Sequence, residues 1–410
     1  MVTSFLRKRK NKERKFLAID IGTSAVKCAI FKKEKEKDFE LKEILSSSFQ
    51  YLEEYNALNA KDFESAVLRK AISLAIKEVQ RLFALFYGRE KNDFPVFLIF
   101  SPNVLKARVV SVRKERKKKL KISKREEKEI YKETLFGAKE KISKEVLEKE
   151  GILDSEICWL SSELISQKID GYLVSQLSGY AGTYIDVKFL IFYTFRNYLQ
   201  RIKQILVDLK IKESSVILPA VKGLLILSKE FKENRIFVDI GAETSEIILI
   251  KEGLIDKVRD FSGGVELFVQ QLTEDLSITE DLAKTLIERY SKRELSQKTQ
   301  SKIKRIIRPG VKEWCFRFKS ALSEISKEGL VWKDISLFGG GAFFCDDIKE
   351  VLAETECREM NTIFDDAFNV KVFSPKEIFS IKDPKNFLKN SPVFTPLLLS
   401  ILSIEEVNKV

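Results

Sequence analysis

One pattern occurs twice in this chain, as AIDIGTSAVKCAIF at residues 18–31 and as FVDIGAETSEIILI at residues 237–250. Each copy has a short apolar run, the tripeptide Asp-Ile-Gly, a few small or polar residues and a second apolar run. Apolar runs on either side of a short polar turn predict the two strands of a β-hairpin. Because one copy lies in each half of the chain, the sequence predicts a duplicated fold with pseudo-twofold symmetry.

The predicted turn of each hairpin carries residues that suit a metal-bound polyphosphate. A carboxylate there can hold Mg²⁺ through water, and exposed backbone N–H groups can wrap around phosphate oxygens. Glycine lets the backbone approach a phosphate closely. The residues selected on these grounds are Asp20, Gly22, Thr23 and Ser24 in the first turn and Asp239, Gly241 and Thr244 in the second.

Two further features extend this candidate site. Lys27 follows the first turn by one strand step, from where its amine could reach the β- or γ-phosphate, although an ordinary strand lysine would look the same. A glycine turn also lies between a predicted strand at 335–338 and a helix that begins at Asp346, where a nucleotide's sugar and α-phosphate would have room. An ordinary tight turn would explain that composition about as well. The residues of this third turn are Gly339, Gly340, Gly341 and Ala342.

Composition excludes several classes of protein. The 410 residues allow two to four domains, and 44% hydrophobic with 33% charged residues is typical of a globular protein. The absence of histidine excludes a Ser-His-Asp triad, a Cys-His dyad and any imidazole metal site. Five cysteines without a Cys-x-x-Cys pair indicate buried thiols in a reducing compartment. No apolar run approaches the roughly 20 residues of a spanning helix, so we expect a cytoplasmic protein.

The formal charge of +12 is concentrated in two segments. Residues 1–15 contain seven basic residues and one acid, and residues 106–128 contain twelve basic residues and three acids. Neither segment has the interleaved aromatic residues of a nucleic-acid surface, so nucleic acid is not an expected partner. A solvated loop is the simplest explanation of the second segment, and a surface for anionic lipid or an acidic partner is the alternative.

Apolar periodicity predicts most of the remaining elements. A charged segment at 104–171 differs in composition from its surroundings and indicates an inserted unit. A polar, basic stretch is expected at 297–308. We predict helices at 62–86, 124–150, 196–209 and 311–326, and strands at 94–100 and 184–192.

In their order and spacing, the three glycine-containing turns resemble the phosphate 1, phosphate 2 and adenosine motifs of the actin-like ATPase superfamily. Within it the chain resembles the bacterial cell-division family FtsA over nearly its whole length. The segments that carry this likeness are Asp170-Gly171 with the loop 177–182, Ser262-Gly263-Gly264, and the closing run 392–398. The pilus-assembly family PilM, with the same fold, is the alternative.

The resemblance implies a mixed α/β, ribonuclease-H-like fold of two domains around a cleft, with an inserted 1C-type α/β subdomain. It divides the chain into a basic tail (1–15), subdomain 1A (16–103 and 172–213), the 1C-type insert (104–171), subdomain 2A (214–262 and 311–360), subdomain 2B (263–310) and a return to subdomain 1A (361–410).

The same resemblance implies ATP and Mg²⁺ as cofactors in that cleft. Asp20 and Asp239 would hold the water shell of Mg²⁺, Lys27 would neutralise phosphate charge, and residues 339–342 would border the sugar and base. Nucleotide state would control self-association into filaments and recruitment of a tubulin-like FtsZ partner through subdomain 2B. The alternative function is a PilM-like cytoplasmic adaptor of type IV pilus assembly, and a phosphotransferase of the sugar-kinase branch is the least favoured.

Two segments depart from the family pattern. The second turn has Ala242 and Glu243 where the family has glycines, and a carboxylate close to a triphosphate would repel it unless it turned outward. In the 2B region, Lys284 and Ile287 stand where the family has a Glu and a Lys that contact the nucleoside, unless a register shift lets Glu280 and Lys284 serve. We therefore predict ATP binding with weak or absent hydrolysis.

The resemblance also raises the question of a membrane anchor. Division-type members end in an amphipathic membrane helix, for which no counterpart is expected after the run 392–398. Phe5 and Leu6, followed by four basic residues, could instead contact an anionic membrane from residues 1–15. A disordered basic tail is the alternative. The expected location is the cytoplasm, with contact at the inner face of the cell membrane.

Overall fold

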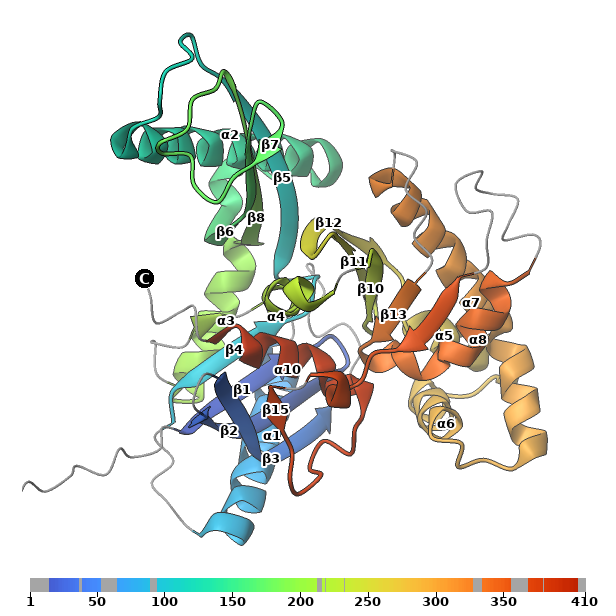
Figure 1. Cartoon of the computed structure of the whole chain (residues 1–410). Coiled ribbons are helices and arrows are strands. Elements are labelled where there is room, and N and C mark those ends of the chain that lie inside the picture. Colours follow the sequence, from blue (N-terminus) through green and yellow to red (C-terminus); the bar gives the residue numbers. More distant parts are fainter. Residues whose placement is uncertain are drawn as a thin grey trace, which may run out of the picture.

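The computed structural model shows two α/β domains and a smaller unit inserted into the first (Figure 1). The structure describes residues 15–36, 39–52, 65–88, 94–211, 216–217, 219–231, 233–326, 334–354, 368–378 and 380–404. The basic tail predicted at 1–15 lies outside these ranges except for Lys15. No helix within them is long and apolar enough to cross a membrane.

The first domain is built on a six-stranded sheet with the order β15-β3-β2-β1-β4-β9. Its strands are β1 (Lys15–Ile21), β2 (Ala25–Glu36), β3 (Phe39–Tyr51), β4 (Val96–Phe100), β9 (Val216–Ile217) and β15 (Ile381–Lys382). Successive residues of β1 face opposite sides of the sheet. Leu17 and Ile19 share a core with α1 (Ser65–Tyr87) and α3 (Arg196–Asp208). Ala18, on the opposite face, packs in a second core with α4 (Ala220–Leu227) and α10 (Thr395–Leu402).

The second domain repeats this arrangement around a sheet with the order β12-β11-β10-β13-β14. One face of β10 packs against helices of this domain, and on the other face Phe237 belongs to the core that contains α4 and α10. The strands are β10 (Arg235–Ile240), β11 (Thr244–Lys251), β12 (Leu254–Ser262), β13 (Asp334–Phe338) and β14 (Asn369–Val372). The helices are α5 (Glu266–Leu276), α6 (Glu280–Ser291), α7 (Gln297–Ile325) and α8 (Cys345–Leu352).

Strand pairing confirms the predicted duplication. β1 pairs antiparallel with β2 and parallel with β4, and β10 pairs antiparallel with β11 and parallel with β13. The two hairpins therefore occupy equivalent places in two sheets of the same topology. The described residues also form short 3₁₀ helices. These are η1 (Asp154–Glu156), η2 (Ser228–Glu230), η3 (Gly340–Phe344), η4 (Pro375–Glu377) and η5 (Pro392–Phe394).

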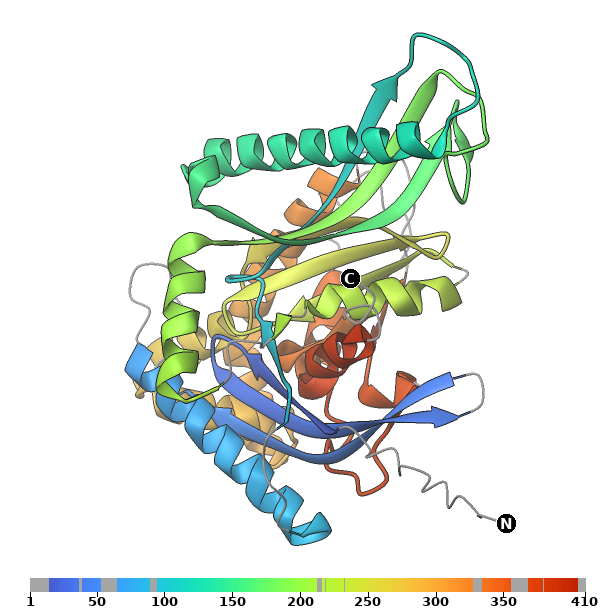
Figure 2. The same cartoon turned by 90° about the vertical axis from the view of Figure 1, so that its left-hand side faces the viewer.

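The inserted unit is a four-stranded sheet covered by one long helix, and it stands above both domains (Figure 2). The helix α2 (Lys124–Glu150) has the predicted bounds, because Ser123 caps its start and Gly151, at φ 70°, ends it. The sheet also includes β8, since β8 pairs with both β5 and β6. Its strands, in the order β5-β8-β6-β7, are β5 (Lys106–Glu115), β8 (Tyr184–Phe195), β6 (Ile157–Ile169) and β7 (Tyr172–Leu173).

One helix differs from its prediction. The sequence predicts a polar stretch at 297–308 and a helix only from 311, which is wrong because α7 is continuous over Gln297–Ile325. Pro309 lies inside it on the exposed side, while Ile303, Ile307 and Val311 are buried. Burial of this unbroken apolar row stabilises the helix even though a proline removes one backbone hydrogen bond.

Candidate functional site

A cleft of about 1600 Å³ lies between the two domains and brings the predicted residues together. Both Asp-Ile-Gly turns line it, as do Lys27 and the first two glycines of the third turn. Gly341 and Ala342 do not line it. Gly341 packs against the side chain of Ile240, and Ala342 is fully buried. Residues from opposite halves of the chain thus form one site.

The two turns have the same local geometry. The N–H of Gly22 donates to the carbonyl of Ala25 at 3.0 Å, and the N–H of Gly241 donates to the carbonyl of Thr244 at 3.1 Å. A Cβ on Gly241 would lie 2.8 Å from that same carbonyl, so only glycine fits there without movement. In the first turn, the N–H groups of Thr23 and Ser24 have no acceptor among the described residues. These donors suit phosphate oxygens.

The first turn holds its carboxylate in an ion pair. Asp20 lies directly opposite Lys27 in the β1–β2 pair, and its Oδ2 is 2.7 Å from the lysine Nζ. Both side chains are largely buried, with 5% and 12% of their surfaces exposed. The ion pair with Asp20 therefore holds the Lys27 amine at the floor of the cleft. A ligand in the cleft can reach the amine there.

In the second turn, no lysine lies opposite the carboxylate of Asp239. Burial raises the pKa of Asp239 to about 7, the charge of Lys27 lowers it, and the charge of Asp20 raises it. Asp239 is thus close enough to the first turn for the charges of Lys27 and Asp20 to affect its pKa. The residue directly opposite Asp239 is Glu246, which is 5% exposed, lines the cleft, and has its pKa raised by burial and by the charges of Asp260 and Asp239.

Sequence reasoning did not select Glu246. Its signal is spacing, because Glu246 follows Asp239 at the same distance in the chain as Lys27 follows Asp20. Since the turns are equivalent, equal spacing places both residues opposite their carboxylates. The duplicated hairpins therefore differ in charge at one equivalent position.

The third turn closes the cleft next to Asp239. Gly339 has φ 84°, and a Cβ there would meet the carboxylate of Asp239 and lie 2.8 Å from the carbonyl of Ile240. Both the left-handed backbone and the close approach require glycine. Beside it, Val265, Val269 and Phe343 provide an apolar part of the lining, which suits the flat face of a base.

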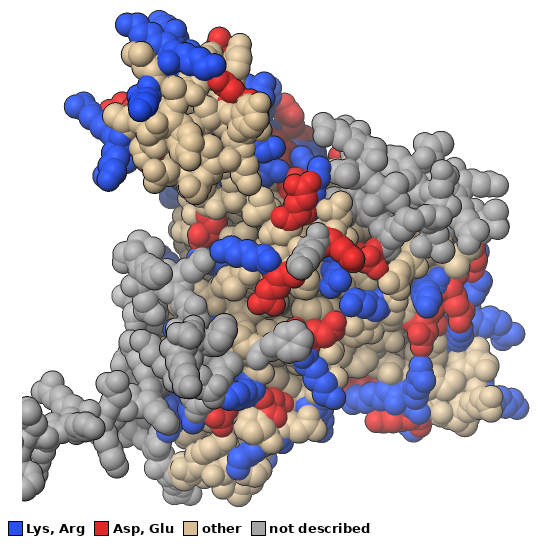
Figure 3. Space-filling model, in the orientation of Figure 1, with Lys and Arg blue, Asp and Glu red and all other residues tan. Residues whose placement is uncertain are grey.

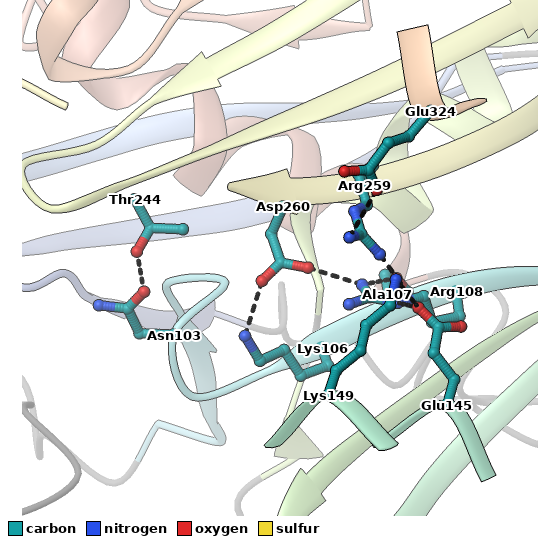
Figure 4. Close-up of polar contacts among 10 residues, drawn as sticks. All are labelled: Asn103, Lys106, Ala107, Arg108, Glu145, Lys149, Thr244, Arg259, Asp260 and Glu324. Atoms are coloured by element: carbon teal, nitrogen blue, oxygen red, sulfur yellow. Dashed lines mark hydrogen bonds and ion pairs between the residues drawn. The ribbon is translucent and has the colours of Figure 1, made fainter. Parts of the chain in front are cut away.

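Glu243 does not line the cleft. The Oε2 of Glu243 accepts a hydrogen bond of 3.1 Å from the side-chain amide of Asn103. The hydroxyl of Thr244 donates to the Oδ1 of Asn103. Asn103 belongs to the segment between β4 and β5, so it ties the second turn to the chain that enters the insert (Figure 4). Sequence reasoning missed Asn103, because nothing in its neighbourhood marks a contact so distant in the chain.

Helix α6 contributes the residues that depart from the family pattern. Lys284 and Ile287 both line the cleft, whereas Glu280 does not. Glu280 instead forms an ion pair of 2.7 Å with Lys284. Glu288, one turn further along, raises the pKa of Tyr51 by its charge and a hydrogen bond, in addition to the effect of burial. Because Tyr51 ends β3, this contact joins the two domains across the cleft.

A network of ion pairs attaches the insert to the second domain (Figure 4). Asp260 on β12 contacts Lys106 and Arg108 on β5, each at 2.7 Å. Arg259 contacts Glu145 of α2 at 3.0 Å and Glu324 of α7 at 2.9 Å. The strand β12 therefore contacts the insert through these ion pairs. It also pairs with β11, the strand that follows the second turn.

The residues at the floor of the cleft fit a nucleotide that brings its own cation. The carboxylates of Asp20, Asp239 and Glu246, the amine of Lys27 and the two N–H groups of Thr23 and Ser24 all belong to residues that line this cleft. Within the described residues no group of three or more Cys, Asp or Glu side chains could hold a metal ion directly. A cation bound here would thus take most of its ligands from phosphate and water, as Mg²⁺ usually does with nucleotides.

No family model and no curated protein matches this sequence. Among solved structures, the chain is similar to one of the PilM–PilN complex of type IV pilus biogenesis, with a TM-score of 0.64 and 14% identity over 95% of this chain and 98% of that one. It is also similar to the ethanolamine utilization protein EutJ from Carboxydothermus hydrogenoformans, with a TM-score of 0.45 and 11% identity over 95% and 88% of the two chains. Component A of (R)-2-hydroxyglutaryl-CoA dehydratase from Acidaminococcus fermentans gives a TM-score of 0.40 and 12% identity over 95% and 96%. Together with the sheet topology, the first likeness shows that this chain has the two-domain, mixed α/β fold of actin-like ATPases, as predicted.

Proposed function

We propose that this protein is a nucleotide-binding adaptor that takes ATP with Mg²⁺ into the cleft between its two domains. The observation that carries this proposal is the convergence of three glycine turns from separate parts of the chain on one cleft, with Asp20 and Asp239 at its floor. Such convergence has no structural purpose in itself, because two acids close together in a partly buried place destabilise a fold.

Each predicted residue has a role in this proposal. Asp20 and Asp239 hold the water shell of Mg²⁺, whose charge offsets that of the carboxylates and the phosphates. Lys27 neutralises part of the phosphate charge. The turns around Gly22 and Gly241 bind phosphate oxygens through backbone N–H groups, and the hydroxyls of Thr23 and Ser24 donate to them as well. Thr244 holds the second turn through its hydrogen bond to Asn103, and Gly339 and Gly340 of the third turn border the sugar and base.

The partner in this proposal is a segment of another assembly protein, and the likeness to a structure of the PilM–PilN complex of type IV pilus biogenesis supports it. Likeness over nearly the full length of both chains favours this pilus-type adaptor over the cell-division scaffold of the FtsA type. A cell-division scaffold of the FtsA type, which would bind a tubulin-like FtsZ partner, would have the same fold as a pilus-type adaptor, and no separate observation favours it. We place the adaptor at the cytoplasmic face of the membrane, where such a partner would present its segment.

In this proposal each part of the chain has its own role. Subdomains 1A and 2A carry the two phosphate turns, and subdomain 2B, around α6, covers the base. The ion pairs of Asp260 and Arg259 join the 1C-type insert to the second domain beside the second turn. A change in that turn on nucleotide binding would therefore reach the insert, which is how ATP would control partner binding.

Titration with a fluorescent ATP analogue, with and without Mg²⁺, tests the nucleotide site. We expect Mg²⁺-dependent binding to the parent protein and its loss in Asp20→Ala. Asp275→Ala, at an exposed position outside the cleft, is the matched control and should bind as the parent does. Equal binding by Asp20→Ala and the control would refute the site. Co-precipitation with a PilN-type or an FtsZ-type protein from the same genome, with and without ATP, then separates the two partner classes.

A further inference from the structure

The insert ends in a surface that the nucleotide site does not use. We refer to residues 116–122, 170–173 and 179–184 as the insert tip, because they connect the strands at that end of the sheet. In Figures 1 and 2 this end of the insert points away from both domains. Its residues are therefore available to something outside the molecule.

Large apolar side chains are exposed at the insert tip. Tyr172 and Leu173 are 78% and 62% exposed, and Leu120 is 62% exposed. Tyr180 and Tyr184 add two further half-exposed rings. Scattered single apolar residues are ordinary on a protein surface, but several at one protruding end indicate a contact site.

Basic residues are exposed in the same insert tip as these apolar side chains. Lys117, Lys118 and Lys121 are exposed and make no ion pair with any residue in the described ranges. Lys119 is 3.5 Å from the carboxylate of Asp170, the acid of the neighbouring turn. Figure 3 shows Lys and Arg gathered over this upper end of the insert. The insert tip thus carries exposed apolar side chains together with lysines.

Hydrogen bonds hold the backbone segments of the insert tip together. Arg116 is buried and donates from its guanidinium to the carbonyls of Leu120, at 3.0 Å, and Gly182, at 2.7 Å. The N–H of Ile122 donates to the carbonyl of Tyr180 at 2.8 Å, and Asp170 accepts from the N–H of Thr183 at 2.9 Å. These bonds hold the three segments together, so their side chains are presented as one surface.

We infer that the insert tip docks on an anionic phospholipid surface. Protruding aromatic and aliphatic side chains can enter the boundary between headgroups and acyl chains, and lysines around them can contact the lipid phosphates. An acidic protein partner would match the lysines, but it would need an apolar surface of its own to cover the exposed rings as well. An anionic membrane supplies both an apolar layer and negative charge, and the residues of the insert tip that would contact it lie within the described ranges.

Co-sedimentation with vesicles tests this inference with the full chain. The vesicles contain equal amounts of phosphatidylglycerol and phosphatidylcholine, with pure phosphatidylcholine as the neutral reference. We expect binding only to the anionic vesicles. The triple variant Lys117→Gln, Lys118→Gln and Lys121→Gln should weaken the partition by about tenfold or more, because each engaged lysine contributes several-fold. The double variant Tyr172→Ser and Leu173→Ser should remove the binding that survives at high salt.

Matched controls keep the test specific. Lys298→Gln, Lys302→Gln and Arg305→Gln remove the same charge from exposed positions of α7, and Leu85→Ser with Leu282→Ser removes exposed apolar side chains elsewhere. Both should bind as the parent does, and a variant without residues 1–14 should retain tip-dependent binding. The inference is overturned if the parent ignores anionic vesicles or if the tip variants bind as well as their controls. Tip-dependent capture on polyglutamate resin that survives the Tyr172 and Leu173 changes, without vesicle binding, would assign the insert tip to an acidic protein instead.

Discussion

Asp239 lies directly opposite Glu246 in the β10–β11 pair, whereas its equivalent Asp20 lies opposite Lys27 in the β1–β2 pair. The first turn therefore carries a neutralised carboxylate, at 2.7 Å from an amine, while the second carries two acids side by side. Because burial disfavours both negative charges, the second turn becomes fully ionised most readily when a cation is present. The Mg²⁺ that accompanies ATP would supply that charge.

Asp239→Asn should stabilise the nucleotide-free protein at high pH. The pKa of Asp239 is about 7 in the folded protein and about 3.8 when unfolded, so the folded state holds its proton more tightly. The free energy of unfolding of the parent therefore falls as pH rises from about 4 to about 7, and the amide removes this loss. Thermal denaturation should show Tm raised by several degrees at pH 8 and nearly unchanged at pH 4. Equal shifts in Tm at pH 4 and pH 8 would contradict the raised pKa of Asp239. The control is Asp275→Asn.

Hydrolysis of ATP should be very slow or absent. Ile287 places an apolar side chain on the cleft, Lys284 is paired with Glu280, and Glu243 faces Asn103, so these three residues offer no group that could activate a water. Steady-state phosphate release at saturating ATP measures the rate, with Asp239→Ala as the blank. Turnover well above that blank would show that another residue of the cleft performs the chemistry.

Asn103→Ala should weaken nucleotide binding although Asn103 does not line the cleft. The amide accepts from Thr244 and donates to Glu243, and these bonds hold the second turn in place. Two hydrogen bonds of about 0.5–1.5 kcal/mol each predict a loss of roughly tenfold in affinity. Titration with the same ATP analogue measures it. Asn369→Ala, at an exposed site on β14, is the matched control, and equal affinities of the two variants would contradict the positioning role.

Asp260→Ala should destabilise the protein strongly. It leaves Arg108, whose side chain is only 12% exposed, with only the Glu145 carboxylate at 4.0 Å, and breaking a buried pair costs about 3–5 kcal/mol. Lys106 and Arg108 also hold the pKa of Asp260 below its ordinary value despite burial. That contribution is present above about pH 4 and is lost as pH falls through the lower folded pKa, so the gap between parent and variant should narrow in acid.

Urea denaturation at pH 7 and at low pH measures this difference. Asp256→Ala on the same strand is the control, because its pair with Lys188 is more exposed, at 23% and 26%, and such pairs contribute at most about 1 kcal/mol. Equal losses in the two variants would show that the Asp260 network does not hold the insert to the second domain.

Local patterns in the chain predicted several elements of the fold. The two Asp-Ile-Gly hairpins, the strand before Gly339 and the full length of α2 all lie where the sequence predicts them. These elements depend on near neighbours, such as a cap at Ser123 or apolar runs beside a turn. The error at α7 has the opposite cause, since burial against the second sheet carries the helix through Pro309.

The sequence by itself determined the duplicated hairpins, their glycines and the carboxylates they carry, because strand period and turn chemistry are local properties of the chain. Only the tertiary structure decided which of these residues meet. It placed Asp239 near Lys27 and turned Glu243 toward Asn103. Those relations depend on how two sheets and an insert pack together, and packing is set by the sum of many weak apolar contacts that no single segment encodes.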